Sequence, residues 1–342
     1  MPAVTISNVQ GAPRSLSDAL FITYAPKTPF TSRIRKGKAI HQELHTYKVK
    51  LKRNVTHSGA SDGQPVTVSS GKNVEREVAT RIGVFKSSPR VTDLAKHKVT
   101  VAQTTGQNPG PNTGTATHMA QAVADHLQAL KFGIEAEALA DQESQPDSGP
   151  NNGSKFRGAG YWIQSTAQTD QPVNADVRTP SAQIYTGAIA DFDEDDLQAL
   201  LQERFESTGA SSELLGIVAP ALKVRIGTFN RRVPTIANYE SVIRYNATDS
   251  EKTVCQGVDF YEGDFGTVEF HSEIFLPSDQ RGYLFDMDHC EMLPFGTGME
   301  EEDLANDGGG SAKVLRAMHA WHPGDPRAHC KIKPSGETAI VH

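Results

Sequence analysis

The chain alternates between apolar and polar residues with a period of two in two stretches, 47–52 and 78–84. This period predicts two half-buried β-strands. Between them, residues 54–73 are rich in Gly, Ser and Thr and show no apolar period. A two-stranded ribbon is marginally stable alone in water, so we expect this hairpin to lie on an adjacent copy of the chain. The apolar residues predicted to make that contact are Tyr47, Val49, Leu51, Val78 and Ile82.

A helical period replaces the strand period from about Thr115 to Ala140. Apolar residues at spacings of three and four draw one stripe along this segment, which is typical of a helix with one buried face. A helix of about 25 residues would be roughly 37 Å long. The stripe consists of Met119, Val123, Leu127, Leu130 and Ile134.

The rest of the chain predicts a mixture of helices and strands, and therefore an α+β protein. Acidic residues at 191–196 favour the start of a second helix, and Pro220 favours the first turn of a third. Residues 296–312 are acidic and Gly-rich, and we expect a loop there. The predicted strands are 98–102, Leu214–Val218, the two arms around Glu262-Gly263-Asp264, Tyr283–Phe285, Lys313–Trp321 and His329–Lys333.

Charge is distributed unevenly along the 342 residues. Residues 1–100 carry 17 Lys/Arg and 6 Asp/Glu, a balance of +11, and the remainder carry 17 and 35, a balance of −18, which sum to the net charge of −7. A basic arm on an acidic body can bind polyanions or acidic copies of itself, and a solvated strand face is the plainer explanation. No run of about 18 apolar residues predicts a membrane helix, and three widely spaced cysteines predict reduced thiols.

Candidate catalytic and metal-binding motifs are incomplete. In His41-Gln-Glu43-Leu-His45 the glutamate occupies the wrong position for a zinc-protease helix, and the segment leads into a predicted strand. Asp286, Asp288 and His289 are metal-ligand residue types without a second cluster at a recognisable spacing. No phosphate-binding loop, dinucleotide fingerprint or nucleophile elbow is present. The sequence therefore predicts neither an enzyme nor a cofactor.

The order of several short motifs resembles the major capsid proteins of tailed bacteriophages with the Hong Kong 97-like fold. The resemblance begins at Thr28-Pro29-Phe30, which is similar to a subgroup with this N-terminal motif. It continues through the hairpin and the end of the long helix, Ile134-Glu135-Ala136-Glu137. Later matching segments are 152–163, 219–229 and 258–268.

The resemblance implies a division of the chain into the parts of that fold. Residues 1–39 would be the N-terminal arm, 40–88 the extended loop and 89–180 the peripheral domain with its spine helix at 115–140. Residues 181–255 would form the axial domain, and 256–342 a β-rich return through both domains.

The resemblance also implies a function, namely a structural shell protein that self-assembles as hexamers and pentamers into an icosahedral head around double-stranded DNA. The expected partners are other copies, a portal, scaffolding or decoration proteins, and DNA held by non-specific contact. The expected location is the virion, after assembly in the host bacterial cytoplasm. Besides the hairpin residues, the predicted interface includes Phe30, Arg33, Arg35 and Lys36.

Three alternatives stay open at this point. An encapsulin-like compartment would keep the fold and enclose a cargo enzyme instead of DNA. A metal-dependent hydrolase would use Asp286, Asp288 and His289. A DNA-binding module would use the basic first hundred residues, and its affinity would fall steeply with salt.

Overall fold

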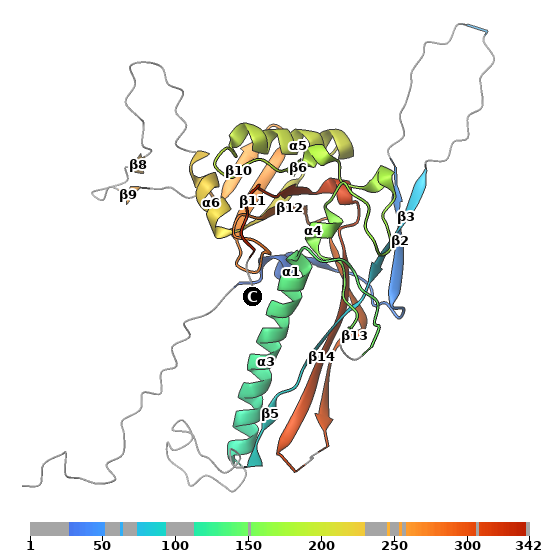
Figure 1. Cartoon of the computed structure of the whole chain (residues 1–342), viewed down its shortest axis with the longest axis vertical. Helices are drawn as coiled ribbons and strands as arrows, with labels where there is room; N and C mark the ends of the chain where they lie inside the picture. The colour runs from blue at the N-terminus through green and yellow to red at the C-terminus, as the bar shows by residue number, and fades with distance from the viewer. Residues whose placement is uncertain are drawn as a thin grey trace, which may run out of the picture.

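The computed structural model describes residues 27–51, 62–63, 74–93, 113–149, 152–229, 245–246, 253–254, 258–305 and 308–339. These residues form a six-stranded sheet with its helices at one end of the molecule, and an elongated sheet backed by one long helix at the other (Figure 1). The six-stranded sheet is called the axial sheet below. A separate hairpin leaves the body on the side away from helix α6 (Figure 1). The predicted strand at 98–102 lies outside the described residues, as do residues 1–26 and most of the predicted hairpin tip.

The axial sheet has six strands in the order β10-β11-β7-β12-β15-β6. Its centre is built from the most apolar strands, because β7 and β12 are buried along almost their whole length. β11 runs parallel to β7, and β15 runs parallel to β6, whereas the other neighbours are antiparallel. The bounds are β6 Ile184–Tyr185, β7 Glu213–Val218, β10 Phe260–Gly263, β11 Gly266–Ser272, β12 Gly282–Asp286 and β15 Cys330–Ile332. These positions confirm the predicted strands at 214–218, around 262–264, at 283–285 and at 329–333.

Helices α5 (Glu194–Thr208) and α6 (Pro220–Gly227) pack on this sheet, and both begin where the sequence predicts. Asp193 caps α5 in a reciprocal capping box, in which its side chain accepts from the backbone of residue 196 and its own backbone N–H donates back. Gly209 ends α5 in the left-handed conformation, with φ 73°, which glycine adopts without strain. The apolar faces of both helices enter one core cluster, which includes Leu197, Leu201, Leu222, Ile226, Val268 and Leu284.

The elongated sheet has the order β1-β13-β14-β4, with β5 also paired to β14. The central pair of this sheet is a long antiparallel ribbon of β13 (Glu291–Leu304) and β14 (Ser311–His322), with a register shift between Pro294 and Met299. The prediction of a loop over 296–312 is therefore wrong for most of its length. Across the ribbon, Glu300 lies opposite Arg316 and Asp303 lies opposite Lys313. The sequence of one strand does not show this cross-strand pairing. The remaining strands are β1 Arg35–Lys36, β4 Gly83–Ser87 and β5 Arg90–Val91.

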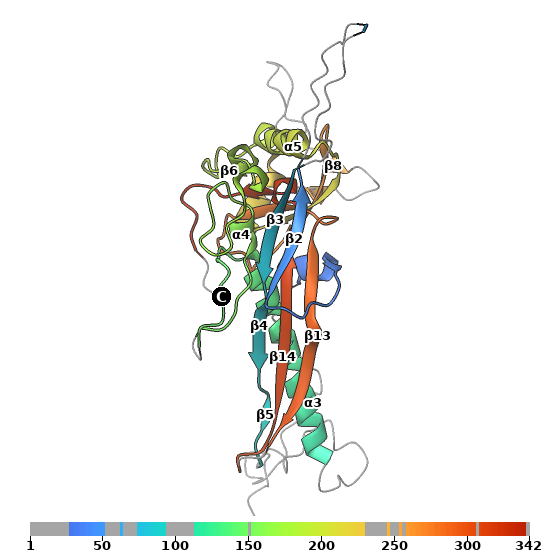
Figure 2. The ribbon, with the colours of Figure 1, turned by 90° about the vertical axis from the view of Figure 1, so that its right-hand side faces the viewer.

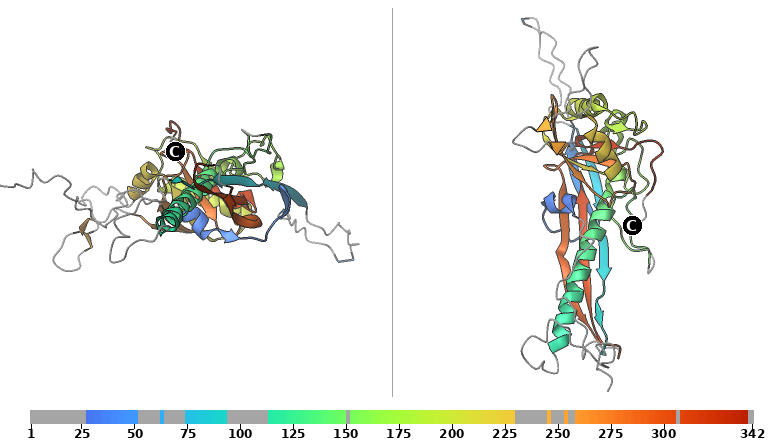
Figure 3. Two further views of the ribbon diagram at one scale, coloured as in Figure 1. Left: turned by 90° about the horizontal axis from the view of Figure 1, so that it is seen from below. Right: turned by 90° about the vertical axis from the view of Figure 1, so that its left-hand side faces the viewer.

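Helix α3 (Thr113–Leu139) lies along the elongated sheet and confirms the predicted spine helix to within two residues (Figure 2). Its stripe is buried at Met119, Leu130 and Ile134, and it continues into the fully buried Ala138 and Leu139 at the junction with the axial sheet. Figure 3 shows α3 running the length of the ribbon from the end far from the axial sheet. The helix thereby ties the two sheets into one body.

The hairpin consists of β2 (Leu44–Lys50) and β3 (Glu75–Arg81), paired antiparallel as predicted. The predicted single strand face from Val78 to Val84 does not persist, because β3 ends at Arg81 and β4 begins in the other sheet at Gly83. Val78 is buried, whereas Val84 is 37% exposed. The smaller elements are α1 Pro29–Arg33, α4 Ala159–Trp162, β8 Tyr245–Asn246, β9 Thr253–Val254, and the 3₁₀ turns Ala175–Val177, Ser181–Gln183 and Pro326–Ala328.

Candidate assembly surfaces

The Thr28-Pro29-Phe30 segment anchors the N-terminal part of the described chain in the core. Pro29 opens helix α1, where its fixed φ is favourable and its missing N–H costs nothing. The Phe30 ring is fully buried, with its centroid 4.8 Å from that of Phe285 and 5.2 Å from that of Trp321. The predicted role of Phe30 in an interface between copies is therefore wrong, since its side chain is already enclosed by its own chain.

Helix α1 takes its N-terminal cap from a residue far away in the sequence. Thr28 makes no side-chain cap. Instead, the backbone N–H groups of Phe30 and Thr31 donate to the two carboxylate oxygens of Glu135 on α3, at 2.9 and 2.8 Å. Glu135 is fully buried, and burial raises the pKa of its carboxyl, an effect that these hydrogen bonds oppose. Glu135 therefore joins the N-terminal segment to the spine helix.

Three cations follow this cap, and two of them form ion pairs. The Arg33 guanidinium makes a bidentate pair with Glu269 on β11, and this pairing lowers the pKa of Glu269 to about 2. Arg35 pairs with Glu291 on β13. The side chains of Arg33 and Arg35 stay 42% and 61% exposed, and Lys36 is exposed beside them. These three residues remain available to a neighbouring copy, as predicted, and their interface role stays a prediction.

The base of the hairpin packs on its own chain. Tyr47 stacks on His322 of β14, with ring centroids 4.3 Å apart, and Val49 and Val78 join the core cluster that contains Trp321. Ile82 is also buried, in a smaller cluster with Leu293. The prediction that the chain alone cannot cover this face is wrong for these residues, because the end of β14 passes beneath the hairpin. Leu51 is partly buried against the same core.

The other face of the hairpin is polar and carries charges of both signs. Lys48 and Lys50 on β2 lie opposite Glu77 and Glu75 on β3. The ammonium of Lys48 is 3.9 Å from the Glu77 carboxylate, and its side chain is 63% exposed. The described part of the hairpin is thus a charge-alternating ladder with lysines along its β2 edge. Because the glutamates of β3 lie beside the lysines of β2, this face of the hairpin is less basic than the sequence of β2 alone suggests.

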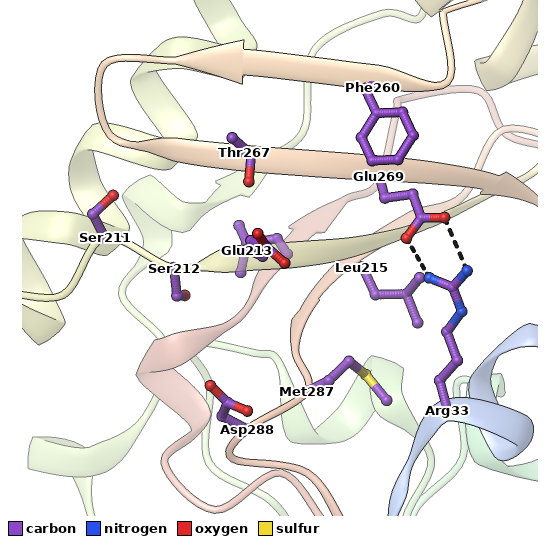
Figure 4. A pocket seen from close by; sticks show the side chains of 11 residues that line it. Arg33, Ser211, Ser212, Glu213, Leu215, Phe260, Thr267, Glu269, Met287 and Asp288 are labelled. Atoms are coloured by element: carbon purple, nitrogen blue, oxygen red, sulfur yellow. Dashed lines mark hydrogen bonds and ion pairs between the residues drawn. The ribbon is translucent and has the colours of Figure 1, made fainter.

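A groove of about 640 Å³ lies where α1 meets the axial sheet (Figure 4). Figure 4 shows Arg33 reaching from α1 to Glu269 on β11, so this ion pair spans the groove. Phe260 on β10 stands at its rim and is 71% exposed. The other lining residues are Ser211, Ser212, Glu213, Leu214, Leu215, Thr267, Met287 and Asp288. The groove is therefore a junction between the N-terminal segment and the axial sheet, with an uncovered aromatic ring.

Asp286, one of the residues proposed for a hydrolytic metal site, takes part in a buried ion pair. Burial opposes the charge of Asp286, but the Ser212 hydroxyl and the Arg204 guanidinium outweigh it and lower the pKa of this carboxyl. The Arg204 nitrogen lies 2.5 Å from the Asp286 oxygen, and the Arg204 side chain is fully buried. Asp288 donates its backbone N–H to the other oxygen of Asp286. Among the described residues, no group of three or more His, Cys, Asp and Glu side chains is arranged to hold a metal ion.

Comparison with known proteins identifies the family. A sequence model of the SU10 major capsid protein family matches residues 3–336, which is almost the whole chain. The chain belongs to the SU10 major capsid protein family. A comparison with curated protein sequences finds no significant match.

Solved structures with the same fold include tailed-phage capsids. The capsid of cyanophage P-SCSP1u shares 11% identity with this capsid protein, over 95% of this chain and 93% of that chain, with a TM-score of 0.58. Mycobacterium phage Bobi shares 10% identity, over 98% and 100% of the two chains, also with a TM-score of 0.58. The SrpI encapsulin of Synechococcus elongatus shares 9% identity, over 97% and 96%, with a lower TM-score of 0.50. At these identities the structures establish the fold, which is the predicted α+β, Hong Kong 97-like capsid fold.

The family match decides between the alternatives that share the fold. Capsid proteins and encapsulins share this architecture, so the fold alone does not separate a virion shell from a cargo compartment. The match to a major capsid protein family assigns this chain a structural role in the head shell of a virion. Copies of the capsid protein therefore build the shell together. Within the described residues, no helix is long and apolar enough to cross a membrane.

Sequence reasoning missed two buried residues that join distant segments of the chain. Glu135 was visible only as part of a motif, and nothing near it in the sequence indicates that it caps α1 across 105 residues. Arg281 was not singled out, yet its buried guanidinium binds Asp141 at the end of α3 and Glu337 in the C-terminal segment. An arginine directly before an apolar strand is the only sequence signal for this site.

Proposed function

We propose that copies of this capsid protein form hexamers and pentamers, which close into an icosahedral head shell around double-stranded DNA. The observation that carries the proposal is the family match over residues 3–336. The hairpin supports it, since β2 and β3 project from the side of the body away from α6 and can reach a neighbouring copy (Figure 1). The predicted division into arm, extended loop, peripheral domain and axial domain belongs to this proposal.

The surfaces proposed to meet a neighbour are polar. With Phe30, Val49, Val78 and Ile82 enclosed by their own chain, the hairpin keeps its outer lysine edge for a contact. The exposed cations of the N-terminal segment, Arg33, Arg35 and Lys36, offer a second patch. Contacts of this kind are weakened by salt, so assembly should depend on ionic strength.

Further partners are part of the same proposal. We include a portal, because a head shell must admit its genome. Scaffolding or decoration proteins, and DNA held through non-specific phosphate contacts, are also included. Assembly in the host bacterial cytoplasm completes the proposal. Extraction of nuclease-protected DNA from particles would support the genome-enclosing role, and a protein cargo in its place would contradict it.

The test of self-assembly is negative-stain electron microscopy, together with sedimentation velocity, on the full-length chain at several salt concentrations. We expect closed shells, or rings of five and six copies, that dissociate as salt rises. A folded monomer under every condition, with the far-ultraviolet circular dichroism of a mixed α/β protein, would contradict self-assembly of the chain.

A further inference from the structure

A second buried carboxyl group lies close to the Glu135 cap. Glu273 directly follows strand β11 and is only 2% exposed. Its backbone N–H donates to the carbonyl oxygen of Val218 at the end of β7, at a distance of 2.9 Å. The strand geometry therefore continues through Glu273, and its side chain lies on the same face of the axial sheet as that of Glu269, which binds Arg33 of α1. Glu273 is thus on the side of the sheet that meets the N-terminal segment.

The two oxygens of the Glu273 carboxyl group have different surroundings. Oε1 accepts the backbone N–H groups of Ile274 and Phe275, at 2.7 and 3.1 Å. Oε2 is buried and has no hydrogen-bond partner among the described residues. A buried carboxylate normally has donors or a cation at both oxygens. Nothing at Oε2 stabilises a negative charge, so this oxygen favours the protonated form of Glu273.

Helix α3 brings the Glu135 carboxylate to this group. Phe132 lies about one turn before Glu135, and its ring centroid is 5.3 Å from that of Phe275, so α3 packs on the segment that carries Glu273. Burial is the larger cause that raises the pKa of Glu273 to about 7, and the charge of Glu135 raises this pKa further. Glu135 has a backbone donor at each oxygen. The negative charge is therefore best placed on Glu135 and the proton on Glu273.

The cations nearest to this face are already engaged elsewhere. Arg33 on α1 makes its bidentate ion pair with Glu269, and His271 on β11 binds the same carboxylate at 2.9 Å. Loss of the Glu273 proton would thus bury a second negative charge beside that of Glu135. Like charges repel strongly where water is excluded, and neither charge can be solvated while both side chains stay buried.

We infer that Glu135 and Glu273 form a proton-controlled lock, which holds α1 on α3 while Glu273 is protonated and loosens α1 when that proton leaves. The proton passes from the Glu273 oxygen to solvent, and the Glu273 carboxylate remains beside that of Glu135. Helix α1 is the part that yields, because it has only five residues and takes both cap bonds from Glu135. Glu273, in contrast, is continuous with the six-stranded axial sheet. Release of α1 lets water reach both carboxylates.

The lock controls how firmly the cations at and after α1 are held. Arg33, Arg35 and Lys36 form the patch proposed above to meet a neighbouring copy. This patch is fixed on the body when Glu273 is protonated and becomes mobile when Glu273 is ionised. The lock itself is a property of the folded chain, so it does not rest on the proposed self-assembly.

The lock is expected to weaken as pH rises. A carboxyl group whose pKa is raised in the folded state stabilises that state below its unfolded pKa, and this contribution is lost as pH rises through the folded pKa. For Glu273 the two values are 4.5, its ordinary pKa, and about 7 in the locked state. Between pH 5 and pH 8, opening of α1 should therefore become roughly 70-fold more favourable.

Hydrogen exchange of the full-length chain tests the lock, with the peptide at 28–35 followed by mass spectrometry from pH 5 to pH 8. Exchange rates are corrected for the intrinsic pH dependence of amides, under salt conditions in which sedimentation shows one assembly state throughout. In the wild-type chain, protection should fall roughly 70-fold and level off near pH 7. Glu273→Gln cannot ionise and should keep its low-pH protection at every pH. Glu135→Gln removes the second charge, so its protection should be weaker and should level off at a lower pH.

Glu137 provides a matched control on the same helix. It lies two residues after Glu135 and therefore on another side of α3, and burial raises its pKa to about 7 as well. Glu137→Gln should keep the wild-type pH dependence of the 28–35 peptide. Loss of this dependence in Glu137→Gln would assign it to the wrong carboxyl group and overturn the lock.

The other outcomes also decide the matter. The lock is wrong if wild-type protection of this peptide is the same at pH 5 and pH 8, or if Glu273→Gln retains the change. It is equally wrong if protection changes to the same extent in peptides throughout the chain. If Glu273→Gln does not fold, Glu135→Gln gives the answer, because protection that levels off at the wild-type pH would overturn the lock. None of these results bears on whether copies assemble.

Discussion

The Glu135 cap offers the sharpest test of how the N-terminal segment is held. Replacing Glu135 with Ala removes both acceptors of the Phe30 and Thr31 N–H groups and leaves these donors buried or half-buried without a partner. A hydrogen bond to a charged group contributes about 1.5–3 kcal/mol. Desolvation of the buried carboxylate offsets part of the gain from two such bonds, so we expect a loss of about 3 kcal/mol in the local stability of α1.

Hydrogen exchange measured by mass spectrometry reads this local stability directly. A loss of about 3 kcal/mol corresponds to roughly 100-fold faster exchange of the affected amides, since 1.4 kcal/mol is a factor of ten. The peptide to follow covers residues 28–35. Glu135→Gln keeps one acceptor oxygen and should cause about half the loss, or roughly 10-fold faster exchange.

A matched control distinguishes the cap from a general effect on α3. Lys131 lies one turn before Glu135 on the same helix and is exposed, so Lys131→Ala should leave exchange of the 28–35 peptide unchanged. The reasoning is refuted if Glu135→Ala exchanges at the wild-type rate in this peptide. It is also refuted if exchange rises equally along the whole chain, because the effect would then be global unfolding.

Three further predictions concern stability. Burial raises the pKa of Glu273 from 4.5 to about 7, so the folded chain binds a proton more tightly than the unfolded chain. The stability contributed by this proton falls as pH rises from about 4.5 to 7, by about 3 kcal/mol at most. Denaturation of Glu273→Gln across this range should lack that part of the slope, and an unchanged slope would exclude Glu273 as its source. Arg281→Ala removes the buried guanidinium that pairs with Asp141 and Glu337, of which Asp141 keeps the ammonium of Lys331 at 3.3 Å, and should cost about 3 kcal/mol. Arg76→Ala breaks an exposed pair and should cost under about 1 kcal/mol. Equal melting temperatures for these two variants would contradict the role of burial. Gly209→Ala should lower the melting temperature through about 1 kcal/mol of strain at φ 73°, and no shift would argue against that conformation.

Local patterns of the sequence were sufficient for most of the regular elements. The stripe from Met119 to Ile134 predicts α3, because residues three and four apart share one helix face whatever surrounds them. The acids before Leu197 and the proline at 220 set the starts of α5 and α6 through groups within one turn. The run Tyr283–Phe285 indicates a central strand because apolar residues on both faces need two covered faces.

The same local reasoning failed where pairing or burial depends on distant segments. Residues 296–312 have the composition of a loop, yet most of them form strands, because each half of the ribbon finds its ladder partner in the other. The alternation at 47–52 does establish a half-buried strand. It does not say whether Val49 is covered by another copy or, as observed, by the cluster around Trp321 in the same chain.

The sequence by itself therefore determined most of the regular elements of this capsid protein and, through its ordered motifs, its family. Tertiary structure decided which surfaces remain free for assembly. Secondary structure is encoded by neighbours within a few residues, whose geometry is fixed by the backbone. Exposure is a relation between segments far apart, such as Phe30 and Glu135, and it exists only once the chain has folded. The free edges of β2 and of β13 at Met299–Leu304 were decided in the same way, because an edge is free only where no other strand of the described fold pairs with it.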